Sequence, residues 1–123
     1  MIVCKFGGTS LSDAGAIARL VEIVRGRLAE HPVVVVSALA GVTDALLGLA
    51  EPVRAGDGKA LDEAVDALLQ RHEATARSLT GGEAALDPIR AETAALRSAL
   101  RAGLGRRLRP ASTSGRRHSR ARV

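Results

Sequence analysis

Two short apolar runs near the start of the chain have the character of strands. Residues 2–6 form the first run, and residues 33–37 form the second, in which four valines are followed by Ser37. The four consecutive valines of the second run are typical of a strand that is covered on both faces, as in a parallel sheet. The pattern therefore predicts two neighbouring parallel strands.

The segment between these runs has a helical period. Its apolar residues recur at the spacing of one helix face: Ile17, Leu20, Val21, Val24 and Leu28. Ser12 or Asp13 is placed to cap the start of this helix, and Pro32 lies beyond its end. A strand, a helix and a second strand at this spacing predict a right-handed βαβ unit.

Helical periods continue after the second strand. We expect a short helix over residues 43–53, a turn at 56–58, and a long helix whose apolar stripe begins at Leu61 and stops at Gly81. Asp87 and Pro88 predict a cap and a first-turn proline for a last helix that runs to about residue 100. His72 lies on the long stripe, where a packed or flanking role is commoner for histidine than a ligand role.

The charge of the chain is unevenly distributed. The total is +5, and residues 101–123 contain eight arginines and no acid. Subtracting this +8 from +5 leaves −3 for residues 1–100. From residue 103 onward the sequence is mainly Arg, Ser, Gly and Ala without a period, which predicts a disordered tail.

Three interpretations of this tail stay open. The first is an arm for nucleic acid or another polyanion, the second is a solvated extension without a role, and the third is the product of a shifted reading frame. We favour the shifted frame, because two strands make a poor sheet and the organised part stops before adding more.

The remaining composition excludes several classes. The single cysteine, Cys4, lies in the first apolar run, where we expect it to be a small buried hydrophobe. Three scattered histidines and one cysteine have no metal-site spacing, so no metal ligands are expected. No signal-like segment precedes the first strand and no apolar run has membrane-spanning length, which indicates a cytoplasmic protein without a membrane partner.

A lysine, two glycines and two hydroxyls stand where the first strand ends. This candidate phosphate-binding stretch consists of Lys5, Phe6, Gly7, Gly8, Thr9 and Ser10. Glycines leave backbone N–H groups open to an anion, and the lysine adds a flexible point charge. The lysine precedes the glycines, so this is not a Walker motif. A plain turn with a surface lysine explains these few residues equally well.

The second strand ends in a similar way. Ser37 is followed by small residues, by Gly41 and by Thr43, which is placed to cap the next helix. Ligands of open α/β sheets bind beyond the carboxyl ends of the strands. We therefore expect both loops to emerge on one rim of the sheet.

Together the stretches KFGGTS at 5–10 and SALAGVTD at 37–44 resemble the start of the aspartokinases, within the amino acid kinase family. The resemblance implies an α/β fold: the N-terminal βαβ portion of the family's three-layer sandwich, followed by a helical excursion. It also implies transfer of the ATP γ-phosphoryl group, with Mg²⁺, to the β-carboxylate of aspartate, the first step towards lysine, threonine and methionine. Full-length members are expected to be homo-oligomers.

By position, the resemblance makes Lys5 the catalytic lysine and residues 5–10 the ATP-binding stretch. Ser37 and Thr43 match residues that contact aspartate. The family's later glutamate for aspartate is missing, since no glutamate follows Glu92. We therefore expect residues 1–102 to be the N-terminal part of a kinase domain, 103–123 to be the tail, and the chain to be an inactive fragment.

One alternative function is that of a small nucleic-acid-binding protein that acts through the Arg-rich tail, and another is that of a regulatory fragment that docks on a full-length kinase through its unpaired sheet edge. Binding of nucleic acid through the tail should weaken steeply with salt. The acidic body and the lack of aromatic residues in the tail disfavour nucleic acid as a partner.

Overall fold

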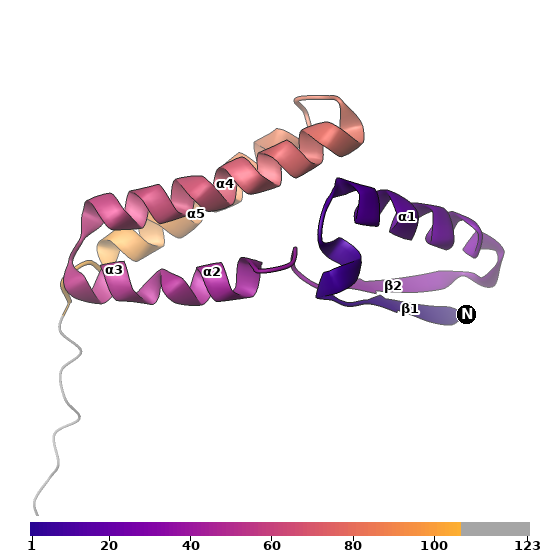
Figure 1. Ribbon diagram of the computed structural model, residues 1–123, viewed down its shortest axis with the longest axis horizontal. Helices are drawn as coiled ribbons and strands as arrows, with labels where there is room; N and C mark the ends of the chain where they lie inside the picture. The colour runs from indigo at the N-terminus through magenta and orange to yellow at the C-terminus, as the bar shows by residue number, and fades with distance from the viewer. Residues whose placement is uncertain (107–123) are drawn as a thin grey trace, which may run out of the picture.

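A parallel strand pair lies in the N-terminal part of the protein. The computed structural model describes residues 1–106, in which β1 (Ile2–Phe6) lies beside β2 (Pro32–Val36) (Figure 1). Ile2 is opposite Pro32 and Phe6 is opposite Val36. The Ser37 amide donates to the Phe6 carbonyl oxygen at 3.2 Å, which extends the pairing by one residue. The predicted parallel strands are confirmed.

The helix α1 (Ala14–Arg25) connects the two strands. Asp13, one of the two expected caps, accepts a hydrogen bond from the Ala16 amide at 2.8 Å. Two short 3₁₀ turns, η1 (Gly8–Leu11) and η2 (Leu28–Glu30), precede and follow α1. Leu28 was expected on the face of α1, but it lies in η2 and is 60 % exposed, because the helix has already ended.

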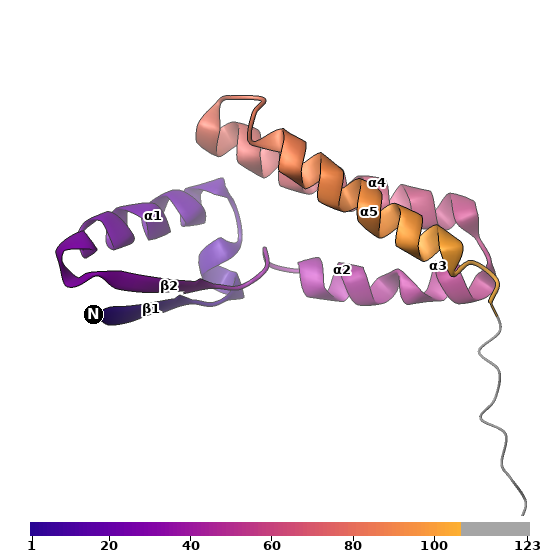
Figure 2. The same cartoon turned by 180° about the vertical axis from the view of Figure 1, so that it is seen from behind.

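Within residues 1–106, four further α-helices form a second part that extends from the end of the sheet. They are α2 (Val42–Gly48), α3 (Ala50–Ala55), α4 (Gly58–Thr80) and α5 (Leu86–Ala102). Figure 2 shows α2 and α3 in one line under the α4–α5 hairpin. The single helix expected over 43–53 is therefore two helices that meet at Leu49.

Two expected caps are wrong. Gly41 occupies the cap position of α2 with φ 79°, so Thr43 lies inside the first turn. Ala85 occupies the N-cap position of α5, so Asp87 and Pro88 are the second and third residues of that helix. A proline fits there because first-turn amides have no helical acceptor. The stop of α4 is as expected, because Gly81 ends the helix at φ 63°. Its cap was not predicted: Asp57, in the expected turn at 56–58, accepts a hydrogen bond from the Ala60 amide.

The helical part has its own hydrophobic core. Buried side chains from α2, α4 and the α2–α3 junction form this cluster: Val42, Leu49, Leu61, Val65 and Leu68. Leu39 from the loop after β2 and Leu104 from beyond α5 pack against it. The Gly105 amide donates to the Val53 carbonyl oxygen at 3.3 Å. The expected disorder from residue 103 therefore does not hold for residues 103–105, and its remainder at 107–123 lies outside the described residues.

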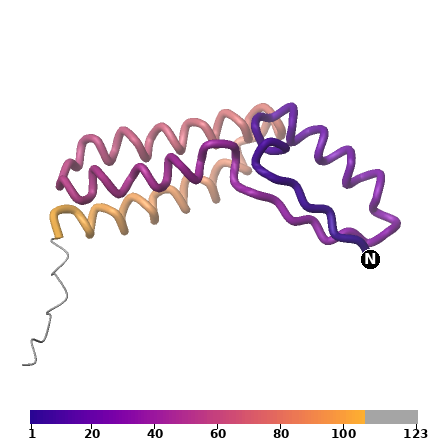
Figure 3. The backbone as a smooth tube through the Cα atoms, turned by 60° about the horizontal axis from the view of Figure 1, so that its bottom comes forward, coloured from indigo at the N-terminus to yellow at the C-terminus, as the bar shows by residue number. Residues whose placement is uncertain are grey.

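The sheet is less covered than its sequence predicts. Val33 to Val36 are each 40–55 % exposed, and Cys4 is half-buried. Only α1 lies along the strand pair in the described part of the chain, while α2–α5 extend away from it (Figure 3). Within residues 1–106, β2 is therefore not covered on both faces and Cys4 is not fully buried, so both of these expectations are wrong.

Ion pairs join α4 to α5 at two levels. Near the start of α4, Asp62 accepts hydrogen bonds from Arg97, at 2.8 Å, and from Arg101. Further along, Glu73 accepts from Arg90 at 2.5 Å. The Arg101 and Arg97 hydrogen bonds hold the pKa of Asp62 below its ordinary value, and the Arg90 bond does the same to the pKa of Glu73.

Acid should loosen the α4–α5 hairpin. A carboxylate whose pKa is lower in the folded state stabilises the fold above its unfolded pKa, and that stability is lost as the pH falls through the lowered value. We expect the melting temperature, followed by circular dichroism at 222 nm, to stay level down to about pH 5 and to fall below about pH 4. Asp62→Asn should flatten this fall. Glu63→Gln, at an exposed carboxylate on the same helix, should not. A melting temperature that rises on acidification would contradict this account.

Candidate functional site

The loops that follow the two strands lie at the same end of the sheet. Since β1 and β2 are parallel, Gly7 and Ser37 both follow a carboxyl end. The Ala40 amide donates to the Leu11 carbonyl oxygen at 3.3 Å, which ties the second loop to the end of η1. The expected common rim is present in the structure.

Lys5 lies on the face of β1 that points away from α1. Along β1 the residues alternate between half-buried and exposed, and Lys5 is exposed whereas Phe6 is half-buried. Phe6 lines a cavity of about 310 Å³ with Leu20 and Ile23 of α1. Because successive side chains of a strand point to opposite faces, Lys5 is directed to the uncovered face.

The expected site residues do not all line one cavity. Thr9 and Ser10 line the cavity beside α1 together with Phe6. Lys5, Ser37 and Thr43 are exposed and lie outside that cavity. The structure therefore brings these residues to the same end of the sheet, but on two different faces of it. They form a rim around the carboxyl ends of the strands.

Gly7 and Gly8 are not required by the fold of the described residues. Gly7 has φ −80°, which any residue adopts, and a Cβ at either position would meet no atom within 4 Å. The open space over this backbone leaves room for a ligand to approach. The first amides of η1 have no helical acceptor, so they are available as donors there.

Gly41 has a different reason to be glycine. Its φ of 79° lies in the left-handed region that side chains disfavour. This turn directs Val42 into the core, where it is 5 % exposed, and leaves Thr43 exposed in the first turn of α2. Among the described residues, the hydroxyls of Ser37 and Thr43 have no hydrogen-bond partner. Both hydroxyls are therefore free to contact a ligand.

Three basic side chains near these loops have no acidic partner within residues 1–106. They are Lys5, Arg19 and Arg71, whereas the arginines along α4 and α5 from Arg77 to Arg101 are all paired with carboxylates. Arg19 lines the cavity that contains Thr9 and Ser10. Arg71 of α4 lies beside Gly41. Sequence reasoning missed both arginines, because neither belongs to a motif of the two loops.

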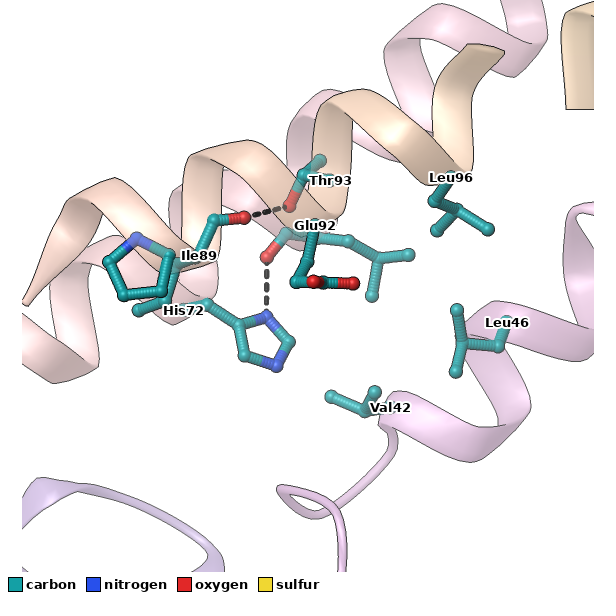
Figure 4. Close-up of a pocket in the computed structure, with 9 residues that line it drawn as sticks. Val42, Leu46, His72, Ile89, Glu92, Thr93 and Leu96 are labelled. Carbon is teal, nitrogen blue, oxygen red and sulfur yellow. Dashed lines mark hydrogen bonds between the residues drawn. The ribbon is translucent and has the colours of Figure 1, made fainter. Parts of the chain in front are cut away.

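An apolar groove of about 560 Å³ adjoins the second loop (Figure 4). Val42 and Leu46 of α2 lie on one side, and His72 of α4 and Glu92 of α5 lie on the other. His72 Nδ1 donates to the Leu68 carbonyl oxygen at 2.7 Å, because a carbonyl can only accept. The expected packed or flanking position of His72 is confirmed. The groove itself was not predicted, since it needs three helices to be placed together.

Two absences apply to the part of the chain that the structure describes. Residues 1–106 contain no group of three or more His, Cys, Asp or Glu side chains that could hold a metal ion. Within the same residues, no helix combines the length and the apolar character that crossing a membrane requires.

A comparison with known protein families shows the family of the chain. A sequence profile described as the amino acid kinase family matches residues 1–108. The chain belongs to the amino acid kinase family. The observed α/β arrangement, with its two-stranded parallel sheet, agrees with this membership.

Several curated relatives from this family are similar to the N-terminal part of the chain. An aspartokinase of Chlamydia muridarum is 42 % identical over 89 residues, which are 72 % of this chain and 18 % of the relative. An aspartokinase of Chlamydia trachomatis is 47 % identical over 81 residues, which are 63 % of this chain and 17 % of the relative. A chloroplastic bifunctional aspartokinase/homoserine dehydrogenase 2 of Arabidopsis thaliana is 36 % identical over 81 residues, 66 % of this chain and 9 % of the relative. The chain thus spans less than a fifth of each of these relatives.

The turn at Gly41 provides a test of the local backbone. Gly41→Ala should lower the free energy of unfolding by about 1–2 kcal/mol, because alanine in the left-handed region is strained. Gly48→Ala is the matched control. Gly48 lies in α2 with no atom near its would-be Cβ, and alanine there should stabilise by about 0.5–1 kcal/mol. Urea unfolding measures both variants, and equal stability of Gly41→Ala and the parent chain would contradict the assignment.

Proposed function

We propose that this chain carries the phosphate-binding and acceptor-binding loops of an aspartokinase. The reaction transfers the γ-phosphoryl group of ATP to an oxygen of the aspartate β-carboxylate, which yields 4-phospho-aspartate and ADP. It is the first step of the route to lysine, threonine and methionine. The observation that carries the proposal is the joining of the two motif loops at one end of the parallel strands, through the Ala40–Leu11 hydrogen bond.

The first loop suits the phosphate groups of ATP. Lys5 supplies an exposed positive charge beside it, which has no acidic partner within residues 1–106. The open backbone at Gly7 and Gly8 supplies N–H donors without a Cβ in the way. Phe6, Thr9 and Ser10 complete the stretch that we assign to ATP. Phosphoryl transfer depends on positioning and on neutralising spread negative charge, and these groups offer both.

The second loop suits the acceptor. Ser37 and Thr43 present exposed hydroxyls at the same end of the sheet, with no hydrogen-bond partner among residues 1–106, and we assign them to aspartate. Mg²⁺ would arrive with the nucleotide, because Mg²⁺ is usually held by substrate phosphates together with one or two carboxylates. We therefore assign no residue of this chain to the metal. The relatives' names support aspartate as the acceptor, and the activity of the whole protein remains part of the proposal.

Lys5 gives the sharpest test of catalysis. Residues 1–102 would replace the matching segment of the Chlamydia trachomatis aspartokinase, and hydroxamate formation from aspartate and ATP would be measured. We expect Lys5→Ala to lower kcat about 10²–10³-fold, the usual effect of removing one group that stabilises transition-state charge. Lys59→Ala is the control, because Lys59 is the other lysine of the chain and its side chain is 88 % exposed at the start of α4. Equal kcat for the Lys5→Ala chimera and its parent would refute the role of Lys5.

Binding by the 123-residue chain tests the first loop without turnover. We expect weak ATP binding, with the largest amide shifts at residues 5–10 in ¹⁵N spectra. Added salt should weaken it, because exposed charges are screened over about 8–10 Å at physiological ionic strength. Lys5→Ala should remove most of this binding and Lys59→Ala should not. ATP shifts confined to α4 and α5 would place the nucleotide elsewhere.

A further inference from the structure

The charged guanidinium of Arg71 lies beside the Gly41 turn in the second loop. Its Nη1 atom lies 3.5 Å from the point that a Cβ on Gly41 would occupy. Gly41 stands between Ser37 at the end of β2 and Thr43 in the first turn of α2. A guanidinium from the middle of α4 is thereby brought to a loop that lies thirty residues earlier in the sequence.

This guanidinium has no anionic partner in the described part of the chain. Arg97, also half-buried, pairs with Asp62 and Asp66 across the α4–α5 hairpin. Arg71 is half-buried as well, but no carboxylate of residues 1–106 lies within ion-pair distance of it. A partly desolvated cation gains most from an anion placed beside it. Residues 107–123 contain no Asp or Glu, so the rest of this sequence offers no acidic side chain for that position.

We propose that Arg71 binds a carboxylate of the acceptor substrate over the Gly41 turn, a role that rests on the proposed function. The planar guanidinium can donate two parallel N–H bonds to one carboxylate, which a lysine cannot do. The free hydroxyl of Thr43, two residues after Gly41, supplies a further donor on the same turn. Lys5 then serves the phosphate groups at the end of β1, and Arg71 serves the acceptor at the end of β2.

The experiment uses the 123-residue chain and three variants of it. L-aspartate and succinate are titrated into ¹⁵N-labelled parent chain, Arg71→Gln, Arg71→Lys and Arg54→Gln. Arg54→Gln is the matched control, because Arg54 is exposed on α3 and its nearest carboxylate is 3.8 Å away. Circular dichroism checks that each variant keeps its helices, and Arg71→Lys keeps the positive charge if Arg71→Gln unfolds.

We expect aspartate to shift the amides of residues 37–43 in the parent chain. Arg71→Gln should raise the Kd about ten- to a hundredfold, the range for loss of a charge-assisted bidentate bond. Arg71→Lys should raise it by a smaller factor, and Arg54→Gln should leave it unchanged.

Each other outcome decides a different point. A Kd for aspartate that Arg71→Gln changes less than twofold overturns the role of Arg71 and leaves the proposed function standing. Succinate binding that depends on Arg71, without any aspartate binding, keeps the carboxylate site and overturns aspartate as the acceptor. If neither dicarboxylate shifts residues 37–43, both the Arg71 site and the assignment of this loop to the acceptor are wrong.

Discussion

The parallel pairing of β1 and β2 is the constraint on which the rest of the structure depends. A parallel pair needs a crossover, and α1 supplies it, capped by Asp13 at its start. The pairing places both carboxyl ends together, so two motifs separated by about thirty residues meet as neighbouring loops. The hydrogen bond from the Ala40 amide to the Leu11 carbonyl oxygen then holds these two loops together. An antiparallel pairing of the same strands would send the loops to opposite ends.

The helical part is built on different forces. Leucine and valine side chains from α2 and α4 form its core, and two levels of ion pairs align α5 on α4. Val42 links the two parts, because it is both the first residue of α2 and a buried member of that core. The position of the second loop is thus set from both sides, by the sheet at Ser37 and by the helical core at Val42. This arrangement also brings Arg71 of α4 to the loop.

The valines of β2 are more exposed than their sequence predicts. The strand has the composition of one that is buried on both faces, yet within residues 1–106 only α1 lies along the sheet. The chain covers 9–18 % of the length of the aspartokinase relatives compared above. The composition of a strand therefore indicates the environment to which the strand is suited. The neighbouring elements determine how much of the strand is buried.

Local patterns in the sequence determined the elements, and tertiary contacts decided the rest. Hydrophobic period and cap chemistry predicted both strands, α1 and the stop of α4 at Gly81, because these signals act within a few residues. The sequence also contained the two motifs, Lys5 to Ser10 and Ser37 to Thr43, and these motifs predicted the family. The caps of α2 and α5 were not predicted, because Gly41 and Ala85 make no side-chain cap hydrogen bond and therefore leave no cap signal in the sequence. The split of the rim over two faces of the sheet, the groove at His72 and the position of Arg71 depend on how separate helices pack. Such packing joins residues far apart in sequence, so no local pattern encodes it.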